Sequence, residues 1–451
     1  MGVQSEGRLL LGMGAPLALS MLIQALYNIV DSIFVSYLGE SALTAVSLSY
    51  PIFMLMISVA VGTGVGINSL ISRRLGAKRH DDAERAAGNG LLLMLLSMVV
   101  FVLFGIFGAR PFIGAYTAEP ETLAYGASYL SIITTYSIGL FLQIFCERIM
   151  QSQGKNLYAM LIQICGAVFN IIFDPILIFG LLGFPRLGIA GAAIATVGGQ
   201  ILAMLISFIV IFSKKNDVRL RVKNFILSAP VVRDIYAVGV PTIVLQAIGT
   251  VMTLLLNGIL IAYTETAVAV FGVYFRVQSI AIMPLLGMTN AGMSIIAFNY
   301  GAQNRKRIMR TWKISLVAGI VMMALMTAVF LLLPDQILGL FNATPEMLRI
   351  GRAALTIIPS CLVLSSVSIN CSVMFQAIGK GSYSMYLSLA RQLVILIPAA
   401  WLLSRAFGEV TAVWWAFPIA EVFTIAVALW MFGYVYSRRI RMLPPEPPAT
   451  V

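Results

Sequence analysis

Long apolar segments are the feature that most restricts how this chain can fold. A membrane-spanning helix needs roughly 20 predominantly apolar residues, and twelve segments of the sequence meet that requirement. They cover about residues 12–37, 45–72, 87–109, 122–148, 158–182, 188–212, 236–262, 267–297, 314–333, 350–376, 383–404 and 412–436. The chain is 60% hydrophobic and only 11% charged, which excludes an ordinary soluble domain. We therefore expect an all-α polytopic membrane protein with 12 transmembrane helices.

Basic residues between the apolar segments predict the orientation, because cytoplasmic loops carry an excess of Lys and Arg. One set of alternate loops contains clusters such as Arg305, Lys306 and Arg307, whereas the other set contains only scattered arginines. The sequence therefore predicts a multi-pass protein of the cytoplasmic (inner) membrane with both termini cytoplasmic. These clusters account for the net charge of +12, so we expect no nucleic-acid partner.

The chain matches itself after a shift of 225 residues. Gly14 and Pro16 then fall on Gly239 and Pro241, and Gln151, Gly154 and Lys155 fall on Gln376, Gly379 and Lys380. Parallel repeats of this kind are typical of transporters that bind substrates between their halves. We predict two six-helix lobes related as parallel repeats: an N-lobe (1–212), a basic cytoplasmic linker (213–235) and a C-lobe (236–451).

Two acidic residues lie deep within the N-lobe segments, where a carboxylate costs several kcal/mol and persists mainly for function. Asp174 stands in the stretch NIIFDPILIFG, and Asp31 stands in the first apolar segment. The 225-residue shift pairs them with Ala399 and Leu256, so these acids belong to the first half alone. Counted from the outer helix ends, Asp31, Asp174 and Thr196 lie at about the same depth, ~10–12 Å below the outer boundary.

Asn170 lies one helical turn from Asp174 on the same face. Two carboxylates, an amide and a hydroxyl at one level suit a small cation such as Na⁺ or a shared proton. The alternative is that Asp31 and Asp174 only form hydrogen bonds with neighbouring helices.

Other polar or soft side chains are candidates for a substrate cavity, although helix packing explains them as well. They are Met21, Gln24 and Asn28 in the first segment, and Gln246 and Asn257 in the seventh. Arg276, Arg391 and Glu421 are charged residues within C-lobe segments. Their presence is explained either by mutual pairing or by an aqueous cavity.

Several motifs together resemble the multidrug and toxic compound extrusion (MATE) family across about residues 10 to 440. They are GAPLALSMLIQALYNIVDSIFVSYLG, ISRRLGAKRHDDAER with its echo IAFNYGAQNRKRIMR, QSQGK, NIIFDP and GIAGAAIATVGGQ. The likeness is closest to the bacterial branches whose coupling acids lie in the N-lobe. It implies a coupling site for Na⁺ or H⁺ at Asp31, Asn170, Asp174 and Thr196, and a first helix that bends at Pro16.

The resemblance implies secondary active efflux of amphipathic or cationic drugs in exchange for Na⁺ or H⁺, by a protein that can work as a monomer among membrane lipids. The alternative is a flippase for lipid-linked oligosaccharides or peptidoglycan precursors, which carries several basic residues in its cavity. An enzyme is disfavoured, because one histidine and four cysteines without C-x-x-C spacing offer no catalytic or metal constellation. We expect no cofactor beyond the coupling ion.

Overall fold

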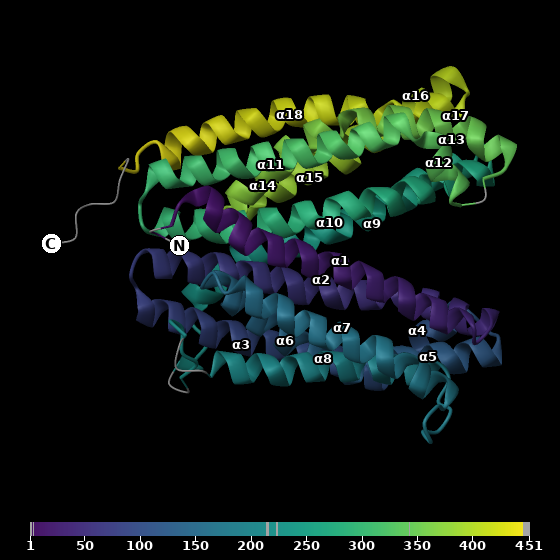
Figure 1. Ribbon diagram of the computed structural model, residues 1–451, viewed down its shortest axis with the longest axis horizontal. Coiled ribbons are helices and arrows are strands. Elements are labelled where there is room, and N and C mark those ends of the chain that lie inside the picture. The colour runs from purple at the N-terminus through teal and green to yellow at the C-terminus, as the bar shows by residue number, and fades with distance from the viewer. Residues whose placement is uncertain (1, 3, 213–215, 222–223, 342, 445–451) are drawn as a thin grey trace. The chain divides into compact units, whose positions relative to one another are not determined.

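The protein is almost entirely helical in its computed structural model (Figure 1), which describes residue 2 and residues 4–212, 216–221, 224–341 and 343–444, the side chains of 28, 29, 32, 36 and 281 excepted. Among these residues, eleven helices are long and apolar enough to cross a membrane, and the bent pair α5 and α6 would make a twelfth span. The predicted class, an all-α polytopic membrane protein, is confirmed.

The first half of the chain forms the first six spans, which correspond to the first six apolar segments. Its helices are α1 (Glu6–Ser36), α2 (Glu40–Gly76), α3 (His80–Leu103), the π-helical turn η1 (Phe104–Gly108), α4 (Ala109–Gly114), α5 (Pro120–Thr135), α6 (Ile138–Ser152), α7 (Asn156–Phe179) and α8 (Ile189–Ile211). The fourth span differs from the continuous helix expected over 122–148, because α5 and α6 meet at a bend of 42°. The Thr134 hydroxyl donates to the Leu130 carbonyl at 2.7 Å just before this bend, a contact that often bends helices.

The second half repeats this order. Its elements are α9 (Ala229–Ile261), α10 (Glu265–Gly301), α11 (Arg305–Leu332), α12 (Pro334–Gly339), α13 (Pro345–Ile357), the 3-10 turn η3 (Ile358–Cys361), α14 (Leu362–Ala377), α15 (Gly381–Leu389), the π-helical turn η4 (Ala390–Leu396), α16 (Ile397–Phe407), α17 (Val410–Trp414), α18 (Ala416–Val435) and the π-helical turn η5 (Tyr436–Ile440). Helix α9 begins inside the predicted linker, because its first turns continue past the apolar segment.

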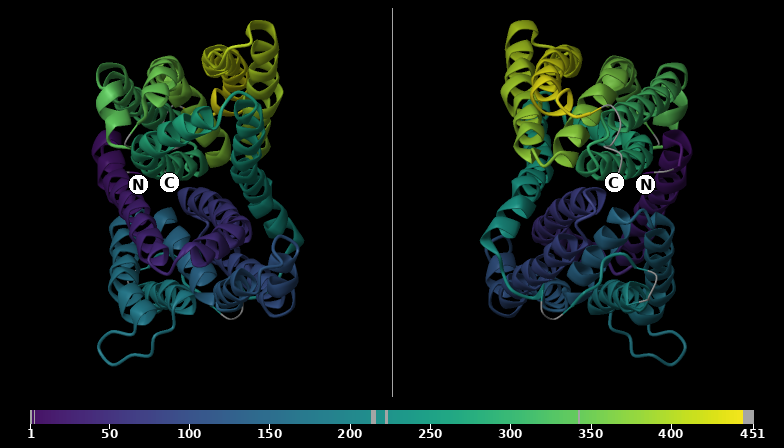
Figure 2. Two further views of the ribbon diagram at one scale, coloured as in Figure 1. Left: turned by 90° about the vertical axis from the view of Figure 1, so that its right-hand side faces the viewer. Right: turned by 90° about the vertical axis from the view of Figure 1, so that its left-hand side faces the viewer.

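The helices pack into two compact units, within each of which they run side by side (Figure 2). We call Leu19–Ile243 the N-unit, and Met1–Ala18 together with Val244–Val451 the C-unit. The unit boundaries fall within α1 and α9, two residues after Pro16 and Pro241, rather than in loops. The predicted N-lobe and C-lobe follow the repeat in the sequence and stay a prediction.

The first turns of α1 belong to the C-unit because they pack against α10. Leu10, Met13 and Leu17 form a buried cluster with Ala291 and Ile295. Small residues allow the close approach that this packing requires. A Cβ atom added at Gly287 would collide with the backbone nitrogen of Ala18, so any larger residue there would separate the helices.

The first turns of α9 pack in the same way against α2 in the N-unit. A Cβ atom at Gly62 would lie 2.9 Å from the carbonyl oxygen of Gly239, and one at Gly66 would collide with the carbonyl oxygen of Ile235. The glycines are therefore needed where the two backbones meet. Gly239 and Gly62 are the repeat partners of Gly14 and Gly287, so both units use the same packing device.

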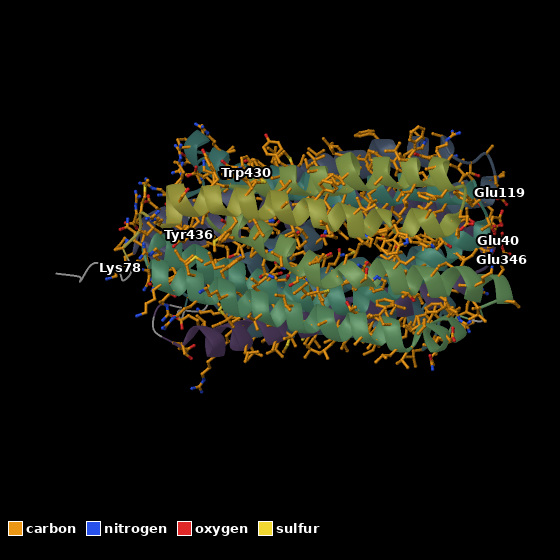
Figure 3. All side chains as sticks on the ribbon, turned by 90° about the horizontal axis from the view of Figure 1, so that it is seen from above. Glu40, Lys78, Glu119, Glu346, Trp430 and Tyr436 are labelled. Carbon is orange, nitrogen blue, oxygen red and sulfur yellow. The ribbon has the colours of Figure 1, made fainter. Side chains whose placement is uncertain are left out.

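Charged side chains of the N-unit are separated between its two ends. Glu40 and Glu119 lie at one end and Lys78 lies at the other (Figure 3). The Lys78 end also contains the ion pair of Arg79 with Asp82 at 2.7 Å. An acidic end and a basic end are typical of a protein that crosses a membrane with its basic loops in the cytoplasm.

A second loop contact closes the basic end of the N-unit. The Lys155 ammonium donates to Asn216 Oδ1 at 2.6 Å, and Asn216 Nδ2 donates to the carbonyl oxygens of Val210 and Ile211 at the end of α8. Partial burial lowers the pKa of Lys155, and the nearby Asp217 carboxylate opposes that effect. The loop after α6 and the chain after α8 are thus tied together.

Candidate coupling site

The predicted coupling residues lie where α7 and α8 pack most closely. A Cβ atom added at Gly199 of α8 would lie 2.6 Å from the carbonyl oxygen of Gly166 on α7. A Cβ atom at Gly166 would in turn lie 3.0 Å from the Gly199 carbonyl oxygen. Glycines facing each other bring helix backbones close enough for short polar side chains to meet.

Asn170 joins the polar residues of these two helices. Its Nδ2 atom donates to Asp174 Oδ1 on the next turn of α7 and to Thr196 Oγ1 on α8, both at 3.2 Å. The side chains are withdrawn from solvent, since Asp174 is 0% exposed, Asn170 2% and Thr196 7%. Three of the four residues predicted from the sequence therefore form one hydrogen-bonded group.

The outer part of α1 lies along α7 and brings Asp31 to this group. Gln163 Nε2 of α7 donates to Gln24 Oε1 of α1 at 2.8 Å, and further along the same pair of helices the rings of Phe34 and Phe179 meet edge to face at 6.5 Å. Between these contacts, the carboxyl groups of Asp31 and Asp174 lie within hydrogen-bonding range of each other. All four predicted coupling residues therefore come together within the N-unit.

Two carboxylates within hydrogen-bonding range of each other repel unless a proton or a cation lies between them. Asp31 Oδ1, Asp174 Oδ2 and Asn170 Oδ1 are buried and have no hydrogen-bond partner among the described residues. An unpaired buried oxygen costs about 1–3 kcal/mol, and more if charged. The donor set of carboxylate, amide and hydroxyl oxygens fits a hard cation such as Na⁺, or a proton shared by the acids.

Two tyrosines complete the surroundings of the acids and were not predicted from the sequence. Tyr27 on α1 and Tyr129 on α5 both lie within electrostatic range of Asp31 and Asp174. Tyr27 precedes Asp31 by one helical turn, so the i, i+4 spacing could have indicated it. Nothing in the sequence links Tyr129 to this position, because it comes from a helix far along the chain.

The five predicted cavity residues are divided between the units. Met21 and Gln24 are half-buried in the N-unit, and the side chain of Asn28 lies outside the described residues. Gln246 is exposed and Asn257 half-buried in the C-unit, where Asn257 Oδ1 has no hydrogen-bond partner among the described residues. The prediction of a cavity lined by both groups stays a prediction.

The charged residues of the C-lobe segments fall into a pair and a single arginine. Arg391 Nη1 lies 3.0 Å from Glu421 Oε1, so for these two residues mutual pairing, one of the two explanations that the sequence left open, is what the structure shows. Arg276 is exposed on α10, and the described residues place no carboxylate within ion-pair distance of it.

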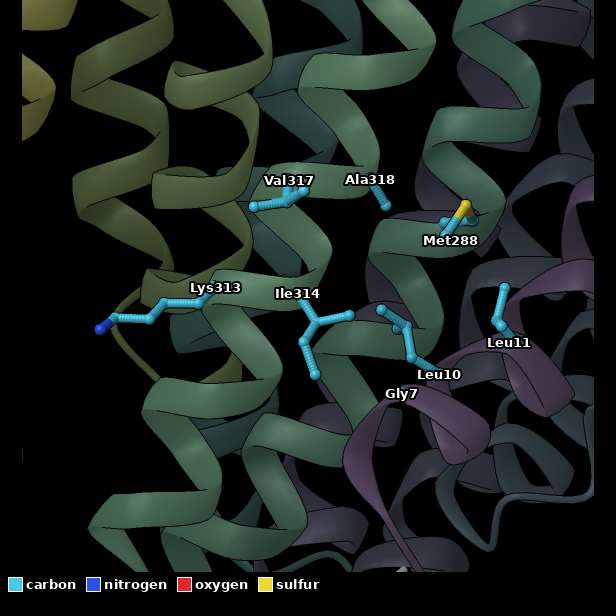
Figure 4. Close-up of a pocket in the computed structure, with 8 residues that line it drawn as sticks. All are labelled: Gly7, Leu10, Leu11, Met288, Lys313, Ile314, Val317 and Ala318. Atoms are coloured by element: carbon cyan, nitrogen blue, oxygen red, sulfur yellow. The ribbon is translucent and has the colours of Figure 1, made fainter.

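Apolar residues line a pocket of about 420 Å³ within the C-unit (Figure 4). Its lining comes from the first turns of α1, from α10 and from α11, and comprises Gly7, Leu10, Leu11, Met288, Lys313, Ile314, Val317 and Ala318. The Lys313 ammonium points away from the pocket in Figure 4. This pocket therefore offers hydrocarbon surface and no group that could bind a coupling ion.

The described part of the chain contains no group of three His, Cys, Asp or Glu side chains that could hold a transition-metal ion. A site for an alkali cation does not require such a cluster, because amide and hydroxyl oxygens serve as ligands. The Asp31 and Asp174 pair therefore remains the candidate site.

Comparison with known proteins shows where this architecture occurs. The family pattern described as MatE matches residues 16–176 and 241–402, one block in each half of the chain. The multidrug export protein MepA of Staphylococcus haemolyticus is 29% identical over 431 residues, which cover 95% of this chain and 92% of that protein.

Solved structures agree over nearly the whole chain. A crystal structure of a MATE protein in complex with MaL6 superimposes with a TM-score of 0.91 at 28% identity, covering 97% of this chain and 98% of the other. A multidrug resistance MATE transporter of the MOP superfamily in an outward-facing conformation gives the same TM-score at 27% identity and the same coverage.

Proposed function

Because this chain belongs to the MatE family of transporters, we propose that it exports amphipathic or cationic drugs across the cytoplasmic membrane in exchange for Na⁺ or H⁺. The family implies a transporter driven by cation antiport, and it is not a family of enzymes. The name of the MepA relatives, multidrug export protein, supports drugs as the substrates. The coupling ion would bind at Asp31 and Asp174.

The observation that carries this proposal is the contact between the half-buried Asp31 carboxyl and the buried Asp174 carboxyl, each of which leaves one buried oxygen unpaired. Without a cation, the charged pair is destabilised by both desolvation and mutual repulsion. A proton or Na⁺ taken from outside would remove both penalties. The site would therefore load strongly in the conformation that faces the higher ion concentration.

Exchange follows if ion and drug favour different conformations. A ligand shifts a conformational equilibrium only by its difference in affinity for the two states. We propose that ion binding at Asp31 and Asp174 favours drug release outside and return to the inward-open state. Drug binding from the cytoplasm would favour the opposite transition and release of the ion inside.

Helix α1 is the element that could link the two events. Pro16 lacks an N–H group, so the carbonyl oxygen of Gly12 loses its helical hydrogen bond and bending there costs less. Asp31 lies on the same helix and meets α7 through the carboxyl pair. We propose that loading of the pair changes the bend at Pro16, as the family resemblance implies.

Charge asymmetry supports cytoplasmic termini, since Lys78 lies at the basic end of the N-unit and the clusters of the later loops lie in the same alternate set. Met21, Gln24, Asn28, Gln246 and Asn257 are proposed to contact the drug. A chain with two halves can enclose its own substrate path, so we propose that the monomer is the working form.

The flippase alternative has less support. A flippase that binds a pyrophosphate needs unpaired cations in its cavity, but Arg391 is already paired with Glu421 at 3.0 Å. Of the arginines within the predicted C-lobe segments, Arg276 alone stays without a carboxylate partner in the described part of the chain.

Efflux of a fluorescent organic cation from liposomes containing the purified protein tests the proposal. A Na⁺ gradient and a pH gradient are imposed separately on wild type, Asp31→Asn and Asp174→Asn. We expect wild type to export the dye under one gradient, which identifies the ion, and both variants to lose gradient-driven export. Asp81→Asn is the matched control, because Asp81 is exposed near the basic end of the N-unit. Export by both variants at the wild-type level would overturn the proposed site.

A further inference from the structure

The C-unit contains a partly buried ion pair that the proposed exchange does not use. Arg391 stands in the π-helical turn η4, and Glu421 stands on α18. Their side chains are 27% and 9% exposed, and Nη1 lies 3.0 Å from Oε1. Burying a carboxylate is costly unless it is paired, and Arg391 is the cation that pairs with Glu421.

The surroundings of Glu421 resemble those of an ion site. Glu421 Oε2 is buried without a hydrogen-bond partner among the described residues. The Tyr274 hydroxyl of α10 and the Cys361 thiol of η3 both lie within electrostatic range of Glu421 and Arg391. Residues from four segments of the C-unit therefore lie within electrostatic range of this ion pair.

The sequence repeat relates this pair to the coupling site. Helices α7 and α8 are the fifth and sixth spans of the first half, and the segment with η4 and the helix α18 are the fifth and sixth spans of the second. In the first half, these spans meet through Asn170 and Thr196 beside Asp174. In the second half, they meet through Arg391 and Glu421.

The acids of the two halves differ in the source of the positive charge that pairs with them. Asp31 and Asp174 have no arginine or lysine within ion-pair distance among the described residues, so their positive partner must come from solution. Glu421 has one positive partner, which is covalently attached to the neighbouring span. Arginine keeps its proton at any physiological pH, so this partner cannot be lost by titration.

Glu421 can exchange ions only if a free cation competes successfully with the Arg391 guanidinium. A tethered group has an effective concentration of millimolar or more and does not diffuse away. A free cation would have to displace the guanidinium, leaving it unpaired in a site that is largely buried. Arg391 also lies in a π-helical turn, a rare element that occurs frequently at functional sites.

We infer that Arg391 is a tethered cation at the contact between the fifth and sixth spans of the second half, and that it confines ion exchange to the N-unit. This inference rests on the proposed function, because it assigns the exchangeable site to Asp31 and Asp174. It makes Arg391 the residue that sets how many ions bind per chain. Removing Arg391 while keeping Glu421 should create one additional exchangeable cation site.

Ion counting on the purified protein tests this inference. Radioactive Na⁺ binding and potentiometric proton titration give the number of each cation bound per chain. We expect Arg391→Met to bind one cation more than wild type, as Na⁺ or as a proton. Arg391→Lys should bind the wild-type number, because a tethered positive charge remains. Glu421→Gln should also leave the number unchanged.

The double variant Arg391→Met with Glu421→Gln keeps the test decisive if a single variant fails to fold. Replacing both partners of a buried ion pair by neutral side chains is often tolerated. We expect this variant to bind as many cations as wild type. A lower count in the double variant or in Glu421→Gln would show that Glu421 exchanges ions in the native protein. No additional cation in a folded Arg391→Met would equally overturn the inference.

These outcomes are separate from those of the proposed function. If wild type bound neither ion at Asp31 and Asp174, the proposed coupling site would be wrong. The Glu421-dependent cation gained by Arg391→Met would still be measurable in that case. The inference about Arg391 would be wrong, and the coupling site right, if Arg391→Met bound the wild-type number of cations and Asp31→Asn bound fewer.

Discussion

Individual hydrogen bonds decide how well the site can hold an ion, and Thr196 offers the simplest case. Its hydroxyl accepts from Asn170 Nδ2 at 3.2 Å and keeps that amide oriented toward Asp174. Thr196→Val retains the shape of the side chain and removes the acceptor. We expect a loss of about 1 kcal/mol, seen as about fivefold weaker apparent ion affinity in the ion dependence of dye efflux.

Two variants control for this prediction at the same scale. Thr196→Ser retains the hydroxyl and should behave as wild type. Thr424→Val removes a threonine hydroxyl whose one hydrogen bond within the described part of the chain goes to the Ala420 carbonyl of its own helix, and it should leave the ion dependence unchanged. Equal effects of Thr196→Val and Thr424→Val would argue against a role for Thr196 in the site.

Packing of whole elements decides whether those side chains meet at all. Gly199→Ala would place a methyl group 2.6 Å from the Gly166 carbonyl oxygen, so α7 and α8 would have to separate. We expect a cost of about 1–3 kcal/mol and weaker ion binding, measured by thermal unfolding and dye efflux. Gly272→Ala is the matched control, since no atom lies within 4 Å of its added Cβ. An unchanged melting temperature in Gly199→Ala would contradict this account of the helix contact.

The end of α8 gives a second prediction at the scale of elements. Asn216 caps two carbonyl groups at that end, at 2.7 and 2.6 Å, and receives the Lys155 ammonium. Asn216→Ala removes the donor to these two carbonyl groups, and we expect a loss of about 1–3 kcal/mol in the free energy of unfolding. Thermal unfolding in detergent measures this loss. Arg219→Ala is the control, because Arg219 is an exposed residue of the same loop. Equal stability of the two variants would show that the loop contact contributes little.

Across the whole molecule, the distribution of charge predicts the orientation in the membrane. Lys78 and Glu119 lie at opposite ends of the N-unit (Figure 3), and basic loops stay in the cytoplasm. In cells, an impermeant maleimide should label a cysteine introduced by Glu119→Cys and not one introduced by Lys78→Cys. Permeabilised cells should label both. The reverse pattern in intact cells would invert the proposed topology.

The two compact units do not coincide with the two halves of the sequence. Each unit includes the first turns of a helix that belongs, by sequence order, to the other half. The first turns of α1 pack on α10 in the C-unit, and the first turns of α9 pack on α2 in the N-unit. Hydropathy could not reveal this, because an apolar helix offers the same transfer energy to lipid and to either partner. The glycines at Gly62 and Gly287 make the choice, since they admit a backbone where other residues would collide.

The sequence by itself determined the membrane class, the positions of the spans, the repeat and the four residues of the candidate site, because each depends on composition or spacing along the chain. Only the tertiary structure decided that Asp31 meets Asp174, that Tyr129 lies within electrostatic range of both and that Arg391 pairs with Glu421. Such pairings depend on the rotation of each helix about its axis and on which helices become neighbours. Those quantities are set by packing between segments far apart in the sequence, and no local pattern records them.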